Sequence, residues 1–199
     1  MMTPGGSPLA PEDSTPAPPG DGDLASFCDR LYVEHAAAVH SYCLSQVGEK
    51  AVAEDLTHET FIRAFAAYAR VQPEPPALRT WLVAIARNLC RDQRRARTRW
   101  QRLAARVGRE EHPADTVEHV AQVRDDLRRV VAAMAELSTR DRELIGLRTA
   151  AGLSYRQIGG LIGVSEETAK VAGFRALRRL RKHLRARGGI VPTQWEAER

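Results

Sequence analysis

Seven arginines lie between Arg87 and Arg102, in a stretch whose only acid is Asp92. Guanidinium groups bind phosphates, while Asn and Asp side chains exchange hydrogen bonds with the edges of bases. A solvated arginine-rich helix is normally interleaved with acids, and this one is not. The pattern therefore favours nucleic-acid binding over a helix that only faces water. The candidate contacts are Arg87, Asn88, Arg91, Asp92, Arg94 and Arg95.

A second basic segment, residues 154–187, has the pattern of a helix-turn-helix. Ser154 and Gln157 form a capping box for a first helix, and Gly163 suits the positive φ of a tight turn. Ser165 then caps a second helix. That helix carries eight Lys or Arg from position 170 onward and no acid, which suits a DNA groove flanked by phosphates. A helical hairpin with a solvated charged face is the alternative.

The segment AEDLTHETFIRAF, residues 53–65, carries two acids four residues apart. Asp55 and Glu59 share one helix face with His58 beside them, and like charges at that spacing cost a few tenths of a kcal/mol, roughly. A basic partner would explain them, although spacing alone favours a solvated acidic face. Catalysis by the pair is disfavoured, because no nucleophile, phosphate-binding loop or metal-ligand cluster accompanies it.

Residues 71–76, VQPEPP, form a stiff loop, since each proline fixes φ and disfavours helix in the preceding residue. With Arg70 before it and Gln72 within it, the loop has the composition to hold an extruded base beside the basic helix. It can equally be a simple connection.

The composition limits the class of protein. The chain has 199 residues, a net charge of +5 and a pI near 9.5, and it is rich in helix-forming residues. Three widely spaced cysteines argue against a disulfide framework, and the scattered histidines argue against a metal site. We therefore expect no metal and no cofactor. The absence of a long apolar run or signal peptide predicts a cytoplasmic protein that does not enter the membrane.

The elements that position these residues are all helical. Helical periodicity covers about 26–47, 51–70 and 77–102, resumes at 117–137, and continues through 139–150 into the helix-turn-helix. The residues before the first helix are rich in Pro and Gly and cannot bury surface, so we expect disorder there. The predicted organisation is a tail at 1–24, a helical domain at 25–102, a flexible linker at 103–116, a second helical domain at 117–187 and a tail at 188–199.

Taken in order, these motifs resemble a bacterial RNA polymerase sigma factor of the extracytoplasmic-function group, over about residues 25–187. AEDLTHETFIRAF is similar to the family's core-binding helix, WLVAIARNLCRDQRR to its −10 helix, and LSYRQIGGLIGVSEETAK to its −35 helix-turn-helix. The resemblance implies an all-α fold with two domains: a region 2 bundle of three to four helices and a region 4 helix-turn-helix, joined by a flexible linker.

The resemblance also implies partners and contacts. The partners are core RNA polymerase, through its beta-prime clamp helices and beta flap, the −10 and −35 promoter elements, and in many members an anti-sigma factor. The face meeting the clamp helices would hold Asp55, His58, Glu59 and Phe61. The −10 strand would meet Arg70, Gln72, Arg87, Asn88, Arg91, Asp92, Arg94 and Arg95. The −35 groove would meet Ser165, Glu166, Thr168, Lys170, Val171, Arg175, Arg178 and Arg179.

The chain departs from the family pattern at several positions. His58 stands where Gln is usual, and Gly159 replaces the usual Ala, which is expected to loosen the first helix slightly. Ala172 lacks the usual basic residue, and Gly173 lies in the middle of the recognition helix. These two residues put the usual −35 contacts in doubt.

We therefore expect a non-enzymatic initiation factor that gives the polymerase its promoter specificity and assists melting of the −10 region. One rival is a stand-alone helix-turn-helix regulator that binds duplex DNA as a dimer. The other is a nuclease or recombinase, which would need clustered carboxylates or a supported Ser or Tyr nucleophile that we do not find.

Overall fold

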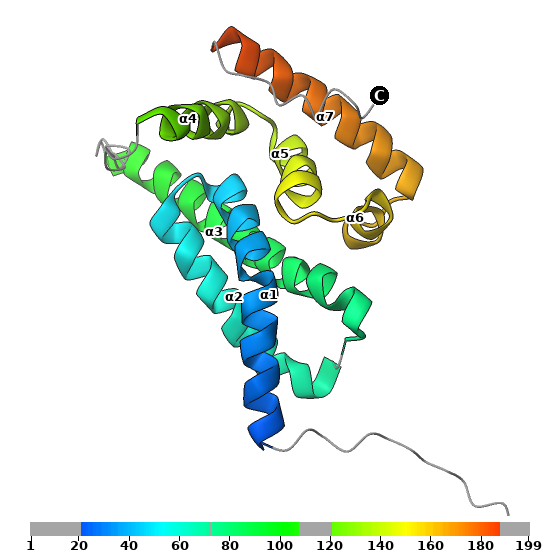
Figure 1. The fold of residues 1–199 in the computed structure, drawn as a ribbon. Helices are drawn as coiled ribbons and strands as arrows, with labels where there is room; N and C mark the ends of the chain where they lie inside the picture. Colours follow the sequence, from blue (N-terminus) through cyan, green and yellow to red (C-terminus); the bar gives the residue numbers. More distant parts are fainter. Residues whose placement is uncertain (1–20, 72, 108–120, 188–199) are drawn as a thin grey trace, which may run out of the picture.

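The computed structural model describes residues 21–71, 73–107 and 121–187, and all of the secondary structure in these ranges is helical (Figure 1). The elements are α1 (Asp21–Val47), α2 (Lys50–Val71), the 3-10 turn η1 (Pro75–Ala77), α3 (Leu78–Val107), α4 (Ala121–Ala135), α5 (Thr139–Ile145), the π-helical turn η2 (Gly146–Ala150), α6 (Tyr155–Ile162) and α7 (Glu166–Ala186). The predicted all-α fold with two helical domains is confirmed.

The first domain is a bundle of α1, α2 and α3. Gly48 ends α1 with a φ of 75°, a conformation that favours glycine, and so lets α2 turn back along α1. The apolar faces of the three helices meet in a core that includes Leu31, Leu56, Leu82 and Leu89. This packing leaves one face of α2 and one face of α3 on the surface of the bundle.

The second domain consists of α4 to α7, and α5, α6 and α7 each begin with a side-chain cap. Ser138 accepts a hydrogen bond from the backbone N–H of Asp141 at the start of α5. Ser154 and Gln157 form the predicted capping box of α6, and Ser165 caps α7 by accepting from the N–H of Thr168. Gly163 between α6 and α7 has a φ of 76°, as the predicted turn requires.

Helix α5 continues into a wider π-helical turn, in which the N–H of Ala151 donates to the carbonyl of Gly146. The sequence predicts one helix over 139–150, so this change in hydrogen bonding is a finding of the structure. Such turns insert one extra residue into a helix and often occur at functional sites. Gly146 begins the turn and is buried.

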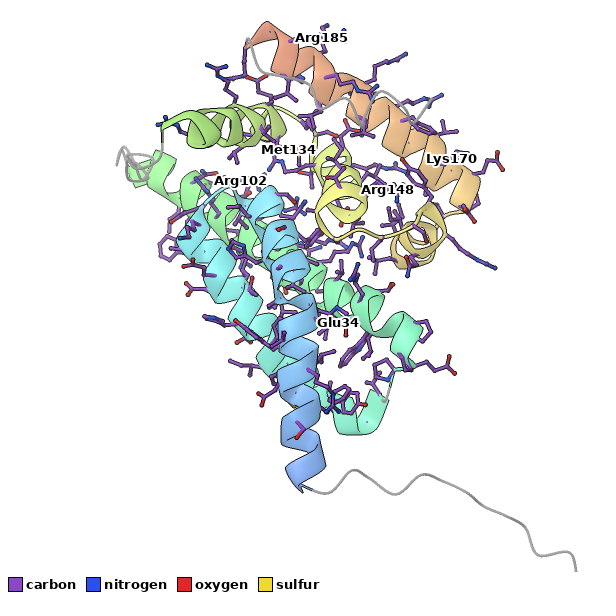
Figure 2. All side chains as sticks on the ribbon, in the orientation of Figure 1. Glu34, Arg102, Met134, Arg148, Lys170 and Arg185 are labelled. Atoms are coloured by element: carbon purple, nitrogen blue, oxygen red, sulfur yellow. The ribbon has the colours of Figure 1, made fainter. Side chains whose placement is uncertain are left out.

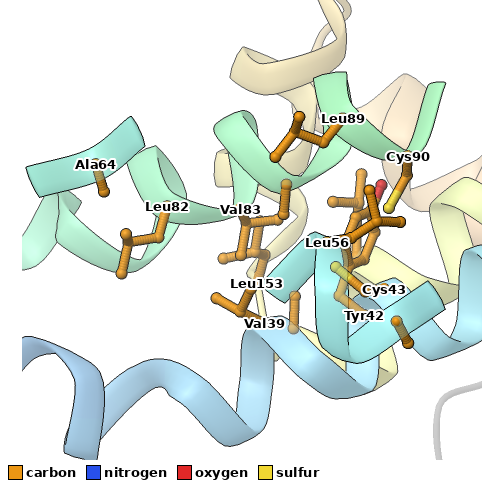
Figure 3. Close-up of a cluster of buried hydrophobic side chains, with 14 of the residues drawn as sticks. Val39, Tyr42, Cys43, Leu56, Ala64, Leu82, Val83, Leu89, Cys90 and Leu153 are labelled. Atoms are coloured by element: carbon orange, nitrogen blue, oxygen red, sulfur yellow. The ribbon is translucent and has the colours of Figure 1, made fainter. Parts of the chain in front are cut away.

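The two domains share part of one hydrophobic core. Leu147 and Leu153 of the second domain are fully buried in a cluster with Val39 and Tyr42 of α1. Figure 3 shows Leu153 beside Val39 and close to Val83 of α3. A separate cluster, built around Met134, Leu177 and Leu180, holds α4 against α7.

Two boundaries differ from the sequence expectation. Helix α1 begins at Asp21, within the predicted tail. Helix α3 continues to Val107, five residues into the predicted linker, since helix-forming Ala and Arg persist there. The remainder of the tail and linker predictions, and the C-terminal tail from residue 188, lie outside the described residues.

Candidate nucleic-acid and partner interfaces

The acidic face of α2 lies on the surface, as its spacing predicts. Asp55 and His58 are exposed and Glu59 is partly exposed. Arg63, one turn further on, donates to a carboxylate oxygen of Glu59 at 2.7 Å, so this acid is already paired. Among the described residues, Asp55 makes no ion pair. The charge of Asp55 is therefore more available to a basic partner than that of Glu59.

Phe61 does not belong to this exposed face. It is 2% exposed and packs against Tyr32 and Phe65, with ring centroids 4.8 and 5.9 Å away. A direct contact between Phe61 and a partner would require the core to unpack. Ile62, which sequence reasoning missed, is 61% exposed and lies seven residues after Asp55 on the same side of the helix. The signal in the sequence that could have identified Ile62 was an apolar side chain at a position on the same helix face as the acids.

The basic helix α3 has two faces with different surroundings. Asn88, Asp92 and Arg95 follow one another at helical spacing and are all exposed. Arg95 lies 3.8 Å from Asp92, a weak pair because both side chains are mostly in solvent. This outward face has the phosphate-binding and base-reading groups that a DNA strand needs.

The outward face extends beyond the predicted residues. Arg99 is exposed four residues after Arg95, and Arg102 lies near the C-terminal end of α3 (Figure 2). Trp100 is 66% exposed, and an exposed aromatic ring beside arginines is a stacking surface for an unpaired base. The sequence analysis did not select Arg99, although the recurrence of arginine four residues after Arg95 was a signal that could have identified it.

Arg87 and Arg94 lie on the inward face of α3, against the second domain and α1. The Arg87 Nε donates to the Glu143 carboxylate of α5 at 2.5 Å, and both side chains are largely buried. Arg94 lies 3.5 Å from the amide oxygen of Gln46. The predicted arginine set is therefore divided, and Arg87 is not available to DNA in this arrangement.

The proline loop is only partly described. Arg70 is exposed at the end of α2, whereas Gln72 lies outside the described residues. Tyr68 stacks on Phe27 with ring centroids 4.0 Å apart, which fixes the end of α2 against α1. Pro75 begins a single 3-10 turn that leads into α3. The loop is thus attached to a rigid support on both sides.

The predicted recognition helix α7 presents its polar residues to solvent. The eight predicted −35 residues are all exposed, namely Ser165, Glu166, Thr168, Lys170, Val171, Arg175, Arg178 and Arg179. The opposite face, with Ala169, Leu177 and Leu180, is buried. Figure 2 shows Lys170 at the beginning of the helix and Arg185 at its end.

Three of these eight residues have other contacts. The Ser165 and Thr168 hydroxyls lie 2.8 Å apart within the helix cap. Arg179 donates from one nitrogen to both oxygens of Asp141 at 2.9 Å, which ties α7 to α5. Arg179 therefore contributes to holding the helix in place, while Lys170 and Val171 are among the exposed residues near its beginning.

The glycines that depart from the family pattern are explained by packing. A Cβ on Gly159 would lie 2.8 Å from the Val164 carbonyl oxygen, so glycine allows the turn to cross α6 closely. A Cβ on Gly173 would lie 2.7 Å from the Tyr155 ring. Gly173 therefore faces the interior of the domain rather than a DNA groove.

Among the described residues there is no group of three or more histidine, cysteine or acidic side chains arranged to hold a metal ion. In the same part of the chain, no helix is long and apolar enough to cross a membrane. Cys28, Cys43 and Cys90 are free thiols.

Comparison with known families matches both domains. The family model for sigma-70 region 2 matches residues 31–100, and that for sigma-70 region 4 matches residues 133–182. The ECF RNA polymerase sigma factor SigL of Mycobacterium tuberculosis is 30% identical over 164 residues, which are 82% of this chain and 92% of that protein. BldN of Streptomyces coelicolor, an ECF RNA polymerase sigma factor, is 32% identical over 82% of this chain and 62% of its own length.

Solved structures show the same arrangement of helices. The sigma factor RpoE from Bartonella quintana, solved with the anti-sigma factor NepR, matches with a TM-score of 0.63 and 27% identity, over 79% of this chain and 96% of that one. CnrH, solved with the cytosolic domain of CnrY, matches in fold with a TM-score of 0.56 and 23% identity, over 84% of this chain and 90% of that one.

Proposed function

The chain belongs to the extracytoplasmic-function group of RNA polymerase sigma factors, and from that premise we propose how its surfaces divide the work of initiation. Core polymerase binds the acidic face of α2. The melted −10 strand binds the outward face of α3, and the closed −35 duplex binds α7.

Most of the support for this proposal comes from the outward face of α3. Asn88, Arg95 and Arg99 present an amide and two guanidinium groups in one line, with Trp100 exposed beside them. Phosphate contacts together with a stacking ring suit a single strand, because the bases are accessible only where the duplex has opened. The proline loop, whose described ends lead from α2 and into α3, supports an extruded base near the beginning of the same helix.

Helix α7 suits the closed duplex instead. A capped helix after a tight turn enters the major groove with its first residues at the base edges. Lys170 and Arg175 bind phosphates, and the exposed Val171 contacts apolar groups such as the thymine methyl. The basic residues further along the helix follow the phosphate backbone.

The remaining partners follow from the family. The acidic face, with Asp55, Glu59 and the exposed Ile62, binds the beta-prime clamp helices, while the second domain meets the beta flap. An anti-sigma factor is a further partner, since the similar sigma factor RpoE was solved in complex with the anti-sigma factor NepR. The protein acts in the cytoplasm. It is not itself an enzyme, because the polymerase carries out RNA synthesis.

The division of labour is tested by two double variants. Asn88→Ala with Arg95→Ala should spare closed-complex formation and impair opening, and a pre-melted −10 bubble should restore part of the activity. Lys170→Ala with Arg175→Ala should weaken recruitment to closed promoter DNA. Gel-shift titration and permanganate footprinting of unpaired thymines measure the two steps. Failure of both variants at the same step would contradict the proposal.

A further inference from the structure

Two of the three cysteines lie together in the core of the first domain. Cys43 of α1 and Cys90 of α3 are both 0% exposed, in the hydrophobic cluster that also contains Tyr42 and Leu56 (Figure 3). Both are free thiols, and Cys28, near the beginning of α1, is a third that is partly exposed. The core of the bundle therefore contains a buried pair of thiols from two different helices.

The two thiols interact directly. Cys90 donates a hydrogen bond to Cys43, and this contact lowers the pKa of Cys43 below its usual value although burial acts in the opposite direction. The same contact raises the pKa of Cys90, while the positive charge of Arg94 acts to lower it. A buried thiol is normally inert, because the thiolate is the reactive form and burial disfavours it. The hydrogen bond from Cys90 gives Cys43 thiolate character in spite of its burial.

The position of the pair suits a disulfide. A disulfide bond is about 2.05 Å long, roughly half the separation of two sulfur atoms in hydrogen-bonding contact. Cys43 and Cys90 belong to helices that already pack against each other in one core. The bond therefore requires a small approach of α1 and α3 and no rearrangement of the bundle.

The oxidation balances with one molecule of a peroxide. The Cys43 thiolate attacks a peroxide oxygen of hydrogen peroxide, the O–O bond breaks, and the products are a Cys43 sulfenic acid and water once a proton is taken up. The Cys90 sulfur then attacks the Cys43 sulfur and loses its proton, and the sulfenic hydroxyl leaves as a second water. Two thiols are thereby oxidised to one disulfide, and the peroxide is reduced to two waters.

The bond would act on the helix that carries the −10 surface. Asn88 and Asp92 are two residues before and two residues after Cys90, so they point to the opposite side of α3, roughly 200° around the helix. Protein cores are close-packed and transmit small displacements. An approach of Cys90 towards α1 therefore moves the outward face of α3 with it.

We propose that Cys43 and Cys90 are an oxidation site, at which a peroxide forms a disulfide that ties α1 to α3, displaces the outward face of α3 and impairs promoter opening until the bond is reduced. Disulfides inside cells are usually transient and sense redox conditions. The effect on opening rests on the proposed function of α3, whereas the disulfide itself is measured without polymerase or DNA.

Peptide mapping tests the bond. The reduced full-length chain is treated with hydrogen peroxide, unfolded, alkylated with iodoacetamide and digested for mass spectrometry. The peptides that contain Cys43 and Cys90 should be recovered as one linked species, which dithiothreitol separates. Cys28→Ala should give the same link, whereas Cys43→Ala and Cys90→Ala, each shown to be folded by circular dichroism, should not.

Permanganate footprinting tests the consequence. The oxidised chain, freed of peroxide, is added to core polymerase on a promoter that the reduced chain opens. Reactivity of unpaired thymines should fall several-fold, gel-shift titration should show that the closed complex still forms, and dithiothreitol should restore opening. The same treatment of Cys43→Ala should leave opening as it was before peroxide, while Cys28→Ala should behave as the wild type.

Three results would overturn the proposal. One is a peroxide-treated chain in which Cys43 and Cys90 are both recovered alkylated and unlinked. Another is a linked chain that opens the promoter as well as the reduced chain. A third is equal loss of opening in oxidised Cys43→Ala, because the damage would then lie elsewhere. A chain that forms the link but supports no transcription when reduced would refute the proposed function and leave the oxidation site standing.

Discussion

Two adjacent glycines of α6 allow a sharp test of how the helix-turn-helix is built. Gly159 and Gly160 occupy the same helix, but only Gly159 lies under the turn. An added Cβ would meet the Val164 carbonyl oxygen at 2.8 Å and the Glu166 nitrogen at 3.3 Å. These are backbone atoms, so relief of the clash requires α7 to move. At Gly160 the same Cβ meets nothing within 4 Å.

The expected magnitudes follow from helix propensity and overpacking. Replacing an exposed helical Gly by Ala stabilises by about 1 kcal/mol, so Gly160→Ala should raise the free energy of unfolding by that amount. Gly159→Ala has the same propensity gain but adds a clash of about 1–3 kcal/mol. Gly159→Ala should therefore be about 1–3 kcal/mol less stable than Gly160→Ala, a difference of several degrees in Tm.

Urea unfolding followed by circular dichroism measures both variants, with gel-shift titration of a −35 duplex as a second readout. Only Gly159→Ala should weaken duplex binding, because the turn sets the angle of α7. Equal stabilisation by the two substitutions would refute the reasoning. It would mean that Ala, usual at position 159 in this family, fits here without strain.

Two further variants test other surfaces. Asp55→Ala with Glu59→Ala should weaken assembly with core polymerase at least about tenfold, because charge-assisted contacts are lost. Co-purification or titration measures this, and the control Glu34→Ala should assemble normally. Unchanged assembly of the double variant would mean that the acidic face only contacts solvent. Burial lowers the pKa of His35 from its usual 6.5, so the unfolded chain binds more protons and stability should fall as the pH drops through that value. His35→Gln should reduce this fall in urea titrations at pH 7.5 and 5.5, and His58→Gln should not.

Local signals in the sequence predicted the secondary structure well. The capping box at Ser154, the positive φ of Gly163 and the cap at Ser165 are all confirmed, because each depends on residues within one turn. The start of α1 was placed too late, since the Pro- and Gly-rich composition of the preceding residues predicts a polar tail and gives no local signal for the helix start. The all-α class followed from composition and periodicity.

Contacts between distant segments could not be predicted in the same way. Nothing local distinguishes Arg87 from Arg95, although Glu143 buries the first and solvent surrounds the second. Phe61 and Ile62 are adjacent apolar residues, and only the position of α1 decides which is buried.

Run-off transcription with purified core polymerase on genomic fragments, with start sites mapped, tests the central claim most directly. The account predicts that adding this chain produces discrete transcripts whose start sites share −35 and −10 sequences, and that the chain alone binds those promoters poorly. Transcripts unchanged by the chain, together with tight and salt-resistant binding of the free chain to duplex DNA, would contradict it and favour a stand-alone regulator.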